Sequence, residues 1–188
     1  MAKILCVILM TLTTAVSTAR QVEQSQAKNA SLSFIRINRN GHQIDTTYKH
    51  LNSIAFKDSI YYLTYTTLDA DGDITRTSYE LPISNSQRTK RLLLDSTDYR
   101  LKYKGLMYLK YDKQYTAYKF LFDDPNADDE EMNYYFIPEF GVVIFRFRAW
   151  GGYERLINNG QQDDFDRLFY LTEKIVSDFN GFYHPTDE

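Results

Sequence analysis

Four acidic side chains in the first half of the chain have a spacing that suits calcium. They stand at positions 1, 3, 5 and 12 of one segment and are Asp69, Asp71, Asp73 and Glu80. An EF-hand loop takes carboxylates from those positions but needs glycine at position 6, where Ile74 stands here. The flanking residues also alternate as in strands. The segment therefore predicts a hairpin turn built on Asp71-Gly72, with a weak Ca²⁺ site as the alternative and no other cofactor.

A second acidic group lies in the segment FDDPNADDEEMN. Its six carboxylates are Asp123, Asp124, Asp128, Asp129, Glu130 and Glu131. Such a run is typical of a solvated loop that mutual repulsion keeps open. Cation binding, or contact with a basic partner, is the alternative.

Basic residues lie on one face of a predicted strand. This face is formed by Lys102, Lys104 and Lys110, with Arg146 and Arg148 as further candidates. Lysines on an outer face discourage association between sheet edges. We expect a solvated face, with binding of an anionic glycan or lipid head group as the alternative.

Aromatic residues make up 15% of the chain, with 16 tyrosines and 12 phenylalanines. Strand propensity accounts for most of them. A tyrosine ring can also line a ligand cleft while its hydroxyl stays wet. The candidates for an aromatic-lined ligand site are Tyr61, Tyr65, Trp150 and Tyr153. Trp150-Gly151-Gly152-Tyr153 predicts a hinge or ledge between large rings, or a bend at a strand end.

Motifs of common catalytic sites are missing from the sequence. It contains no Gly-x-Ser-x-Gly, no His-Glu-x-x-His and no glycine-rich phosphate loop. His42, His50 and His184 are not brought together by any pattern. A carboxylate pair for glycoside hydrolysis stays open, although the sequence nominates no pair. Catalysis is therefore uncertain, and a non-catalytic role is favoured.

The elements that must position these residues are mostly strands. Between Arg100 and Tyr111, apolar side chains alternate with lysines, as in a strand with one buried face. Three hairpins follow from this periodicity and from the turn residues between the strands. Their strands are expected at 59–68 and 74–83, 100–111 and 115–122, and 133–137 and 142–150.

The period changes to that of a helix once, near the C-terminus. The apolar residues at helical spacing are Phe165, Leu168, Phe169, Thr172, Ile175, Val176 and Phe179. Asp163 and Asp164 favour the N-terminal end of a helix, and Asn180-Gly181 favours its stop. We expect an amphipathic helix over about 163–179 that lays its phenylalanine-rich face on the sheet.

The first nineteen residues predict a cleaved signal peptide. Lys3 precedes an apolar run from Ile4 to Leu12, and Ser17 and Ala19 form a small-x-small cleavage pattern. The run is too short to cross a bilayer as a helix. We expect a flexible lead-in over 20–30 and a single β-rich domain over 31–188. The mature chain would be exported to a bacterial periplasm or to the exterior.

Charge and cysteine content further restrict the class of protein to which this chain can belong. The chain carries 22 basic and 25 acidic residues, and removal of Lys3 makes it one unit more negative. This balance argues against nucleic-acid binding. The only cysteine is Cys6, so the mature chain forms no disulfide. No later segment is apolar enough for a transmembrane span.

The segment 134–145, YYFIPEFGVVIF, resembles small exported bacterial β-meander proteins, many of unassigned function and some distantly similar to lipoprotein carriers. The resemblance implies an exported sheet curled around a helix, with an apolar cleft, and transfers no catalytic residue. We therefore expect a mainly β (α+β) fold, a curved antiparallel meander of about seven or eight strands with one C-terminal helix. The expected function is binding of an unknown ligand or envelope protein. A hydrolase of extracellular polymers and an apolar-ligand carrier are the alternatives.

Overall fold

The computed structural model describes residues 24–68, 72–83, 91–94, 97–123, 131–178 and 181–183. Within these ranges lie ten β-strands and one α-helix, α1 (Phe165–Val176), which follows a short 3-10 turn over Gln162–Asp164. In chain order the strands are β1 (Gln24–Ile37), β2 (Gln43–Lys57), β3 (Ile60–Leu68), β4 (Ile74–Pro82), β5 (Arg91–Leu94), β6 (Thr97–Lys110), β7 (Gln114–Asp123), β8 (Met132–Ile137), β9 (Gly141–Phe147) and β10 (Tyr153–Asn158).

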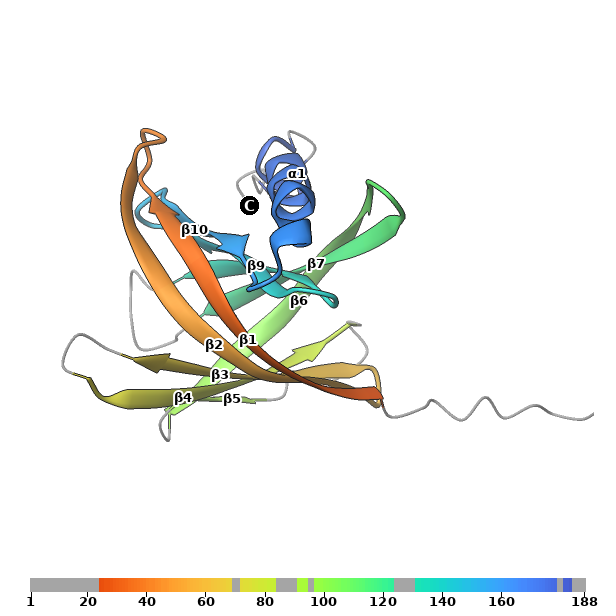
Figure 1. The fold of residues 1–188 in the computed structure, drawn as a ribbon. Coiled ribbons are helices and arrows are strands. Elements are labelled where there is room, and N and C mark those ends of the chain that lie inside the picture. Colours follow the sequence, from red (N-terminus) through yellow and green to blue (C-terminus); the bar gives the residue numbers. More distant parts are fainter. Residues whose placement is uncertain are drawn as a thin grey trace, which may run out of the picture.

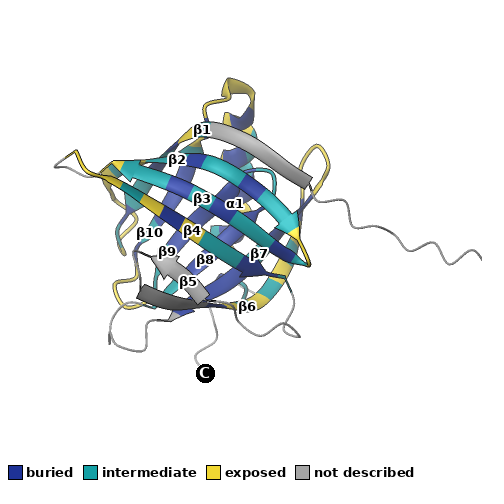
Figure 2. Cartoon of the chain, turned by 90° about the horizontal axis from the view of Figure 1, so that it is seen from below, coloured by how far each residue is buried: buried dark blue, intermediate teal, exposed yellow. Residues whose placement is uncertain are grey.

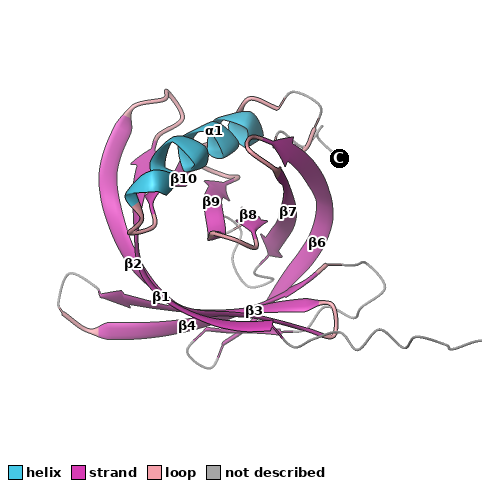
Figure 3. Ribbon diagram, turned by 45° about the vertical axis from the view of Figure 1, so that its right-hand side comes forward, coloured by secondary structure: helices cyan, strands magenta, loops and turns pink. Residues whose placement is uncertain are grey.

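The strands form one closed antiparallel barrel in which neighbours in sequence are neighbours in space (Figure 3). β1 closes it by pairing with both β2 and β10. The mainly β class, the antiparallel meander and the single C-terminal helix are confirmed among the described residues. The expected seven or eight strands are too few. The segment 150–153, predicted as a hinge or a bend, turns the chain back into β10, and β9 ends at Phe147 rather than at Trp150.

The flexible lead-in predicted for residues 20–30 is wrong for residues 24–30. β1 already begins at Gln24, whose backbone pairs with Phe56 of β2. A ladder satisfies backbone N–H and C=O groups whatever the side chains are. A polar segment without apolar periodicity can therefore join a sheet when a partner strand is long enough.

Aromatic rings from different strands meet inside the barrel. The ring centroids of Phe34 (β1) and Phe145 (β9) lie 5.5 Å apart, and those of Phe145 and Tyr134 (β8) lie 5.0 Å apart. Tyr79 of β4 continues the contact, 5.7 Å from Tyr134. Figure 2 shows buried residues recurring along neighbouring strands. The rings thus connect opposite walls of the barrel through its interior.

The helix α1 packs on the outer face of the barrel against β10 and β9, between the upper ends of the β1–β2 and β6–β7 hairpins (Figure 1). Its buried side chains are Leu168, Leu171, Thr172 and Ile175. Phe165 and Phe169 are about half exposed, which corrects the expected phenylalanine-rich contact face. No helix among the described residues is long and apolar enough to cross a membrane.

Candidate functional site

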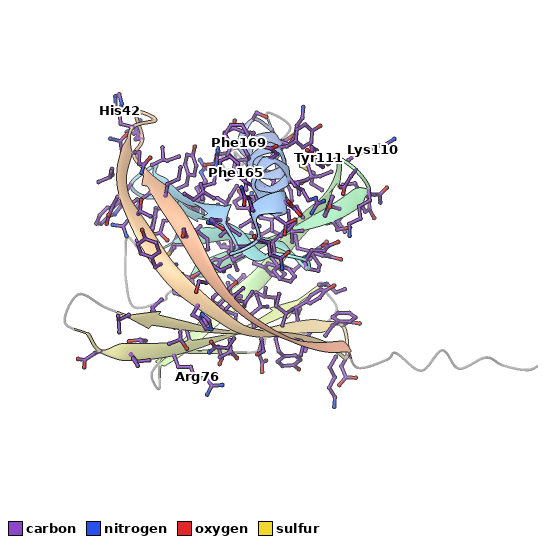
Figure 4. The ribbon with its side chains drawn as sticks, viewed as in Figure 1. His42, Arg76, Lys110, Tyr111, Phe165 and Phe169 are labelled. Atoms are coloured by element: carbon purple, nitrogen blue, oxygen red, sulfur yellow. The ribbon has the colours of Figure 1, made fainter. Side chains whose placement is uncertain are left out.

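A polar pocket of about 430 Å³ lies where three connections meet near the N-terminus of α1. The connections are the β6–β7 turn, the β8–β9 turn and the segment from β10 to α1. The lining residues are Asp112, Lys113, Tyr115, Glu139, Phe140, Asn159, Gln161, Asp164 and Arg167. Figure 4 marks two of the bordering elements, with Lys110 and Tyr111 at the end of the β6–β7 hairpin and Phe165 on α1.

Arg167 of α1 joins the helix to the β6–β7 turn. Its Nη2 lies 2.9 Å from Oδ2 of Asp112, and its Nη1 donates to Asp164. The side chain of Asp164 is about one-tenth exposed and also accepts a hydrogen bond of 2.7 Å from Nδ2 of Asn159. The guanidinium therefore holds two carboxylates from distant parts of the chain in one fixed arrangement.

Tyr115 and Asp112 form a second fixed pair. The Tyr115 hydroxyl donates a hydrogen bond of 2.9 Å to Asp112 Oδ1, and its ring stacks on Phe140 at 5.9 Å. Burial, followed by the hydrogen bond to Asp112, raises the pKa of Tyr115 to about 12. Desolvation alone would raise the pKa of Asp112, but hydrogen bonds from Tyr115 and from backbone amides, together with Arg167, lower it. Tyr115 therefore stays a donor and Asp112 stays charged near neutral pH.

Lys113 and Glu139 form the exposed rim of the pocket. Their Nζ and Oε1 atoms lie 3.1 Å apart, and the Lys113 ammonium lies 4.9 Å from the centroid of the Tyr115 ring. The lining thus combines three carboxylates with two cations. The Nε of Arg167 is buried and has no hydrogen-bond partner among the described residues. The lining therefore presents mainly carboxylate oxygens, which are acceptors, to a polar ligand.

The two tyrosines predicted from β3 lie inside the barrel. Tyr65 is 2% exposed, and its hydroxyl accepts a hydrogen bond of 2.9 Å from the backbone N–H of Val142. Tyr61 is half-buried, with its ring 4.8 Å from that of Phe136. A Cβ at Gly141 would lie 2.7 Å from the Tyr65 hydroxyl, so glycine permits this close approach. Both tyrosines therefore pack the core.

The other two predicted aromatic residues lie elsewhere. Trp150 is 75% exposed in the β9–β10 turn. Tyr153 begins β10 and meets the ring of Tyr183 edge-on at 6.2 Å. The structure therefore does not gather the four aromatic candidates into one cleft.

The candidate calcium ligands fall into two groups. Asp69 and Asp71 lie outside the described residues, as does the acidic stretch 124–130. Asp73 precedes β4 and Glu80 lies seven residues further along, a separation of about 23 Å in an extended strand. A single ion cannot bridge that distance. The described residues contain no group of three potential ligands close enough to hold a metal.

Comparison of the chain with models of known protein families, with curated proteins and with solved structures found no match. The sequence marks Asp112-Lys113-Gln114 as a turn and Asp163-Asp164 as a helix start. It carries no sign that these meet, because the contact depends on how α1 docks on the barrel.

Proposed function

We propose that this chain is an exported, non-catalytic binding protein whose polar pocket takes a small ligand with several hydroxyl or amine groups. The observation that carries the proposal is the pocket itself, in which charged side chains from three separate connections surround about 430 Å³. Carboxylates exceed cations by one in its lining, so ligand groups that donate hydrogen bonds fit it best.

Ion pairing in the pocket favours binding over hydrolysis. A glycosidase needs one carboxyl group whose pKa is raised, so that it can donate a proton. The pKa of Asp112 is lowered, Asp164 is paired with Arg167, and Glu139 is paired with Lys113. No carboxylate here is set apart as a proton donor, and all three can accept hydrogen bonds from a ligand.

Packing inside the barrel argues against an apolar-ligand carrier. Phe120 and Phe136 are fully buried, and Tyr61 lies 6.1 Å from Tyr118 across the interior. A carrier needs a cavity lined by such rings rather than rings in mutual contact. The described interior side chains therefore stabilise the fold, and we expect the ligand to bind on the outside of the barrel.

Amide NMR titration of the mature protein tests the binding site. The probes are glucose, N-acetylglucosamine, glycerol and spermidine, which present hydroxyl or amine donors. We expect at least one probe to shift amides of 112–115, 139–140 and 159–167 in a saturable manner. Asp112→Asn should weaken that binding by about tenfold, because it removes a charged acceptor.

Arg76→Gln is the matched control, since Arg76 is exposed on β4, away from α1 (Figure 4). It should leave the affinity unchanged. Absence of saturable shifts with all four probes would contradict the proposed site. Hydrolysis of a glycan that Asp112→Asn abolishes would replace binding by catalysis.

Export is tested separately, through the mass of the protein recovered from the periplasm or medium of a bacterial host. The intact mass should correspond to a chain beginning at Arg20. Ala19→Arg should block cleavage and leave the longer chain in the membrane or cell fraction. Recovery of uncleaved wild-type protein from the cytosol would contradict export.

A further inference from the structure

A second cluster of polar side chains lies on the outer face of β6–β9. Strand register places Gly105 (β6) opposite Lys119 (β7), and Lys119 opposite Tyr135 (β8). On the same face, Asn133 of β8 lies opposite Arg146 of β9. Side chains alternate along a strand, so Lys119 and Asn133 point away from the interior that Phe120 and Tyr134 occupy.

Lys119 is buried without an ionic partner. The residue is 6% exposed, and no hydrogen bond or ion pair joins its ammonium, which lies at the edge of the buried region, to the described residues. The ammonium lies over the ring of Tyr135, 5.8 Å from its centroid. Gly105 supplies no side chain on the neighbouring strand. A buried ammonium in this situation is costly unless something accepts its hydrogen bonds.

The charges around Lys119 are mostly positive. Burial first, then Arg146, Arg148 and Lys104, lower the pKa of Lys119 to about 8. Asp178 is the one carboxylate among the described groups that shift this pKa, and its effect is the smallest. Arg148 pairs with Glu131, and Arg146 donates to the backbone carbonyl of Tyr183, so part of this charge is already engaged. Cations still outnumber carboxylates around Lys119, which favours an anion there although the chain as a whole carries a net charge of −3.

Asn133 supplies a second, independent sign of a ligand. It is 2% exposed, and its Nδ2 is buried with no hydrogen-bond partner in the described structure. An unsatisfied buried amide donor costs about 1–3 kcal/mol. Sequence periodicity places Asn133 at the edge of an apolar strand and gives no hint that its amide lacks an acceptor.

We propose that Lys119 and Asn133 bind a small oxyanion, a phosphate or sulfate group, on the outer face of β6–β9 between the cations of β6 and β9. Such a group accepts hydrogen bonds from both donors and offsets the positive charge of Lys119 and the neighbouring Lys104. The Asn133 amide is buried, so the proposed ligand is a compact group and not a flat polymer surface. This site is separate from the polar pocket at the N-terminus of α1.

Isothermal titration with inorganic phosphate and with sulfate tests the proposal, against chloride at equal ionic strength and neutral pH. We expect saturable binding of at least one oxyanion. In a parallel NMR titration, the shifted amides should centre on residues 119, 133 and 146. Lys119→Met should weaken binding at least about tenfold, as expected for loss of a charged hydrogen bond. Lys110→Met is the matched control, because Lys110 is exposed at the end of β6 (Figure 4) and should bind as wild type does.

A measurement on the wild-type chain removes any dependence on how the variants fold. The pKa of the Lys119 ammonium, followed by NMR, should rise when the bound oxyanion is present, because an adjacent negative charge favours the charged form. An unchanged pKa, no saturable binding beyond that of chloride, or undiminished binding by folded Lys119→Met would each overturn the proposal.

Discussion

At the scale of single residues, Arg167 shows how one side chain can set both a site and a docking geometry. It pairs with Asp112 and with Asp164, and the latter is about one-tenth exposed. Removing the cation would leave the Asp164 carboxyl group poorly solvated, with Asn159 as its remaining side-chain partner among the described residues. We therefore expect the ion pair between Arg167 and Asp164 to contribute more to folding stability than the exposed pair at the rim of the pocket.

Arg167→Met should lower the free energy of unfolding by about 1–3 kcal/mol, because it strands a partly buried carboxylate. Urea unfolding followed by circular dichroism measures the loss. Lys113→Met is the control, since Lys113 and Glu139 are both substantially exposed and such pairs contribute at most about 1 kcal/mol. Equal losses in the two variants would show that Arg167 does not organise the pocket.

Lys119 leads to a prediction of the opposite sign. Its folded-state pKa of about 8 lies below the unfolded value of about 10.4, so the folded state loses its proton first. The unfolded state binds more protons between these values, and stability rises with pH across that window. The cost of the buried charge is therefore complete below pH 8 and disappears as pH approaches about 10.4.

Lys119→Met should accordingly stabilise the oxyanion-free protein by about 1–3 kcal/mol at neutral pH, and this gain should shrink toward pH 10. Urea midpoints for both proteins in chloride buffers, compared at several pH values, give the difference. Lys110→Met should show no such trend. A gain that is independent of pH would assign the effect to packing rather than to charge.

At the scale of elements, the strands were the most predictable feature and the contact face of the helix was not. Alternating side chains between Arg100 and Tyr111 correctly predict β6, because one wet face and one buried face leave a period of two. Helical periodicity correctly places α1 but allows several neighbouring faces to dock. The observed face is centred on Leu168, Leu171 and Ile175.

Arg155 accounts for part of this difference. Its guanidinium pairs with Glu173 and lies 4.6 Å from the centroid of the Phe169 ring. A cation over an aromatic ring is favourable without full burial of that ring. Phe169 can therefore remain half exposed while smaller aliphatic side chains fill the space against the sheet. The periodicity of the helix sequence cannot predict this contact, because its other partner, Arg155, lies on β10.

Leu171→Ala should cost about 2–5 kcal/mol of unfolding free energy, because it leaves a cavity beneath the helix. Phe165→Ala should cost less than about 1 kcal/mol, since Phe165 is about half exposed. Parallel urea titrations compare the two variants. A larger loss for Phe165→Ala would restore the phenylalanine-rich contact face that the sequence suggests.

At the scale of the whole molecule, closure of the barrel depends on one seam that local sequence cannot reveal. β1 meets β10 more than a hundred residues later, with Arg36 opposite Glu154. Glu154 accepts from Arg36 at 2.9 Å and from Lys49 of β2 at 3.2 Å. The three charges thus join β1, β2 and β10 at the point of closure. The candidate pocket could not be predicted from the sequence for the same reason. Its walls come together only when the barrel closes and α1 docks.

Lys49 is held in an apolar setting at this seam. Its ammonium lies 3.8 Å from the centroid of the Phe145 ring, and burial lowers its pKa although Glu154 opposes the shift. Arg36 is the other charged group acting on it and lowers the pKa further. Glu154 is therefore the carboxylate that, among the described residues, favours the charged form of this buried lysine.

Glu154→Gln should destabilise the fold by about 1–3 kcal/mol at neutral pH, because it leaves the Lys49 ammonium buried beside Arg36 without a counter-charge. The folded-state pKa of Lys49 falls further in the variant, so the unfolded state binds more protons and the stability of the variant rises with pH. Its deficit relative to wild type should therefore shrink in alkaline buffer, as measured by urea unfolding. Glu139→Gln, at an exposed pair, should show neither the loss nor the recovery. A deficit that is constant with pH would mean that Glu154 supports the seam through its hydrogen bonds and not through its charge.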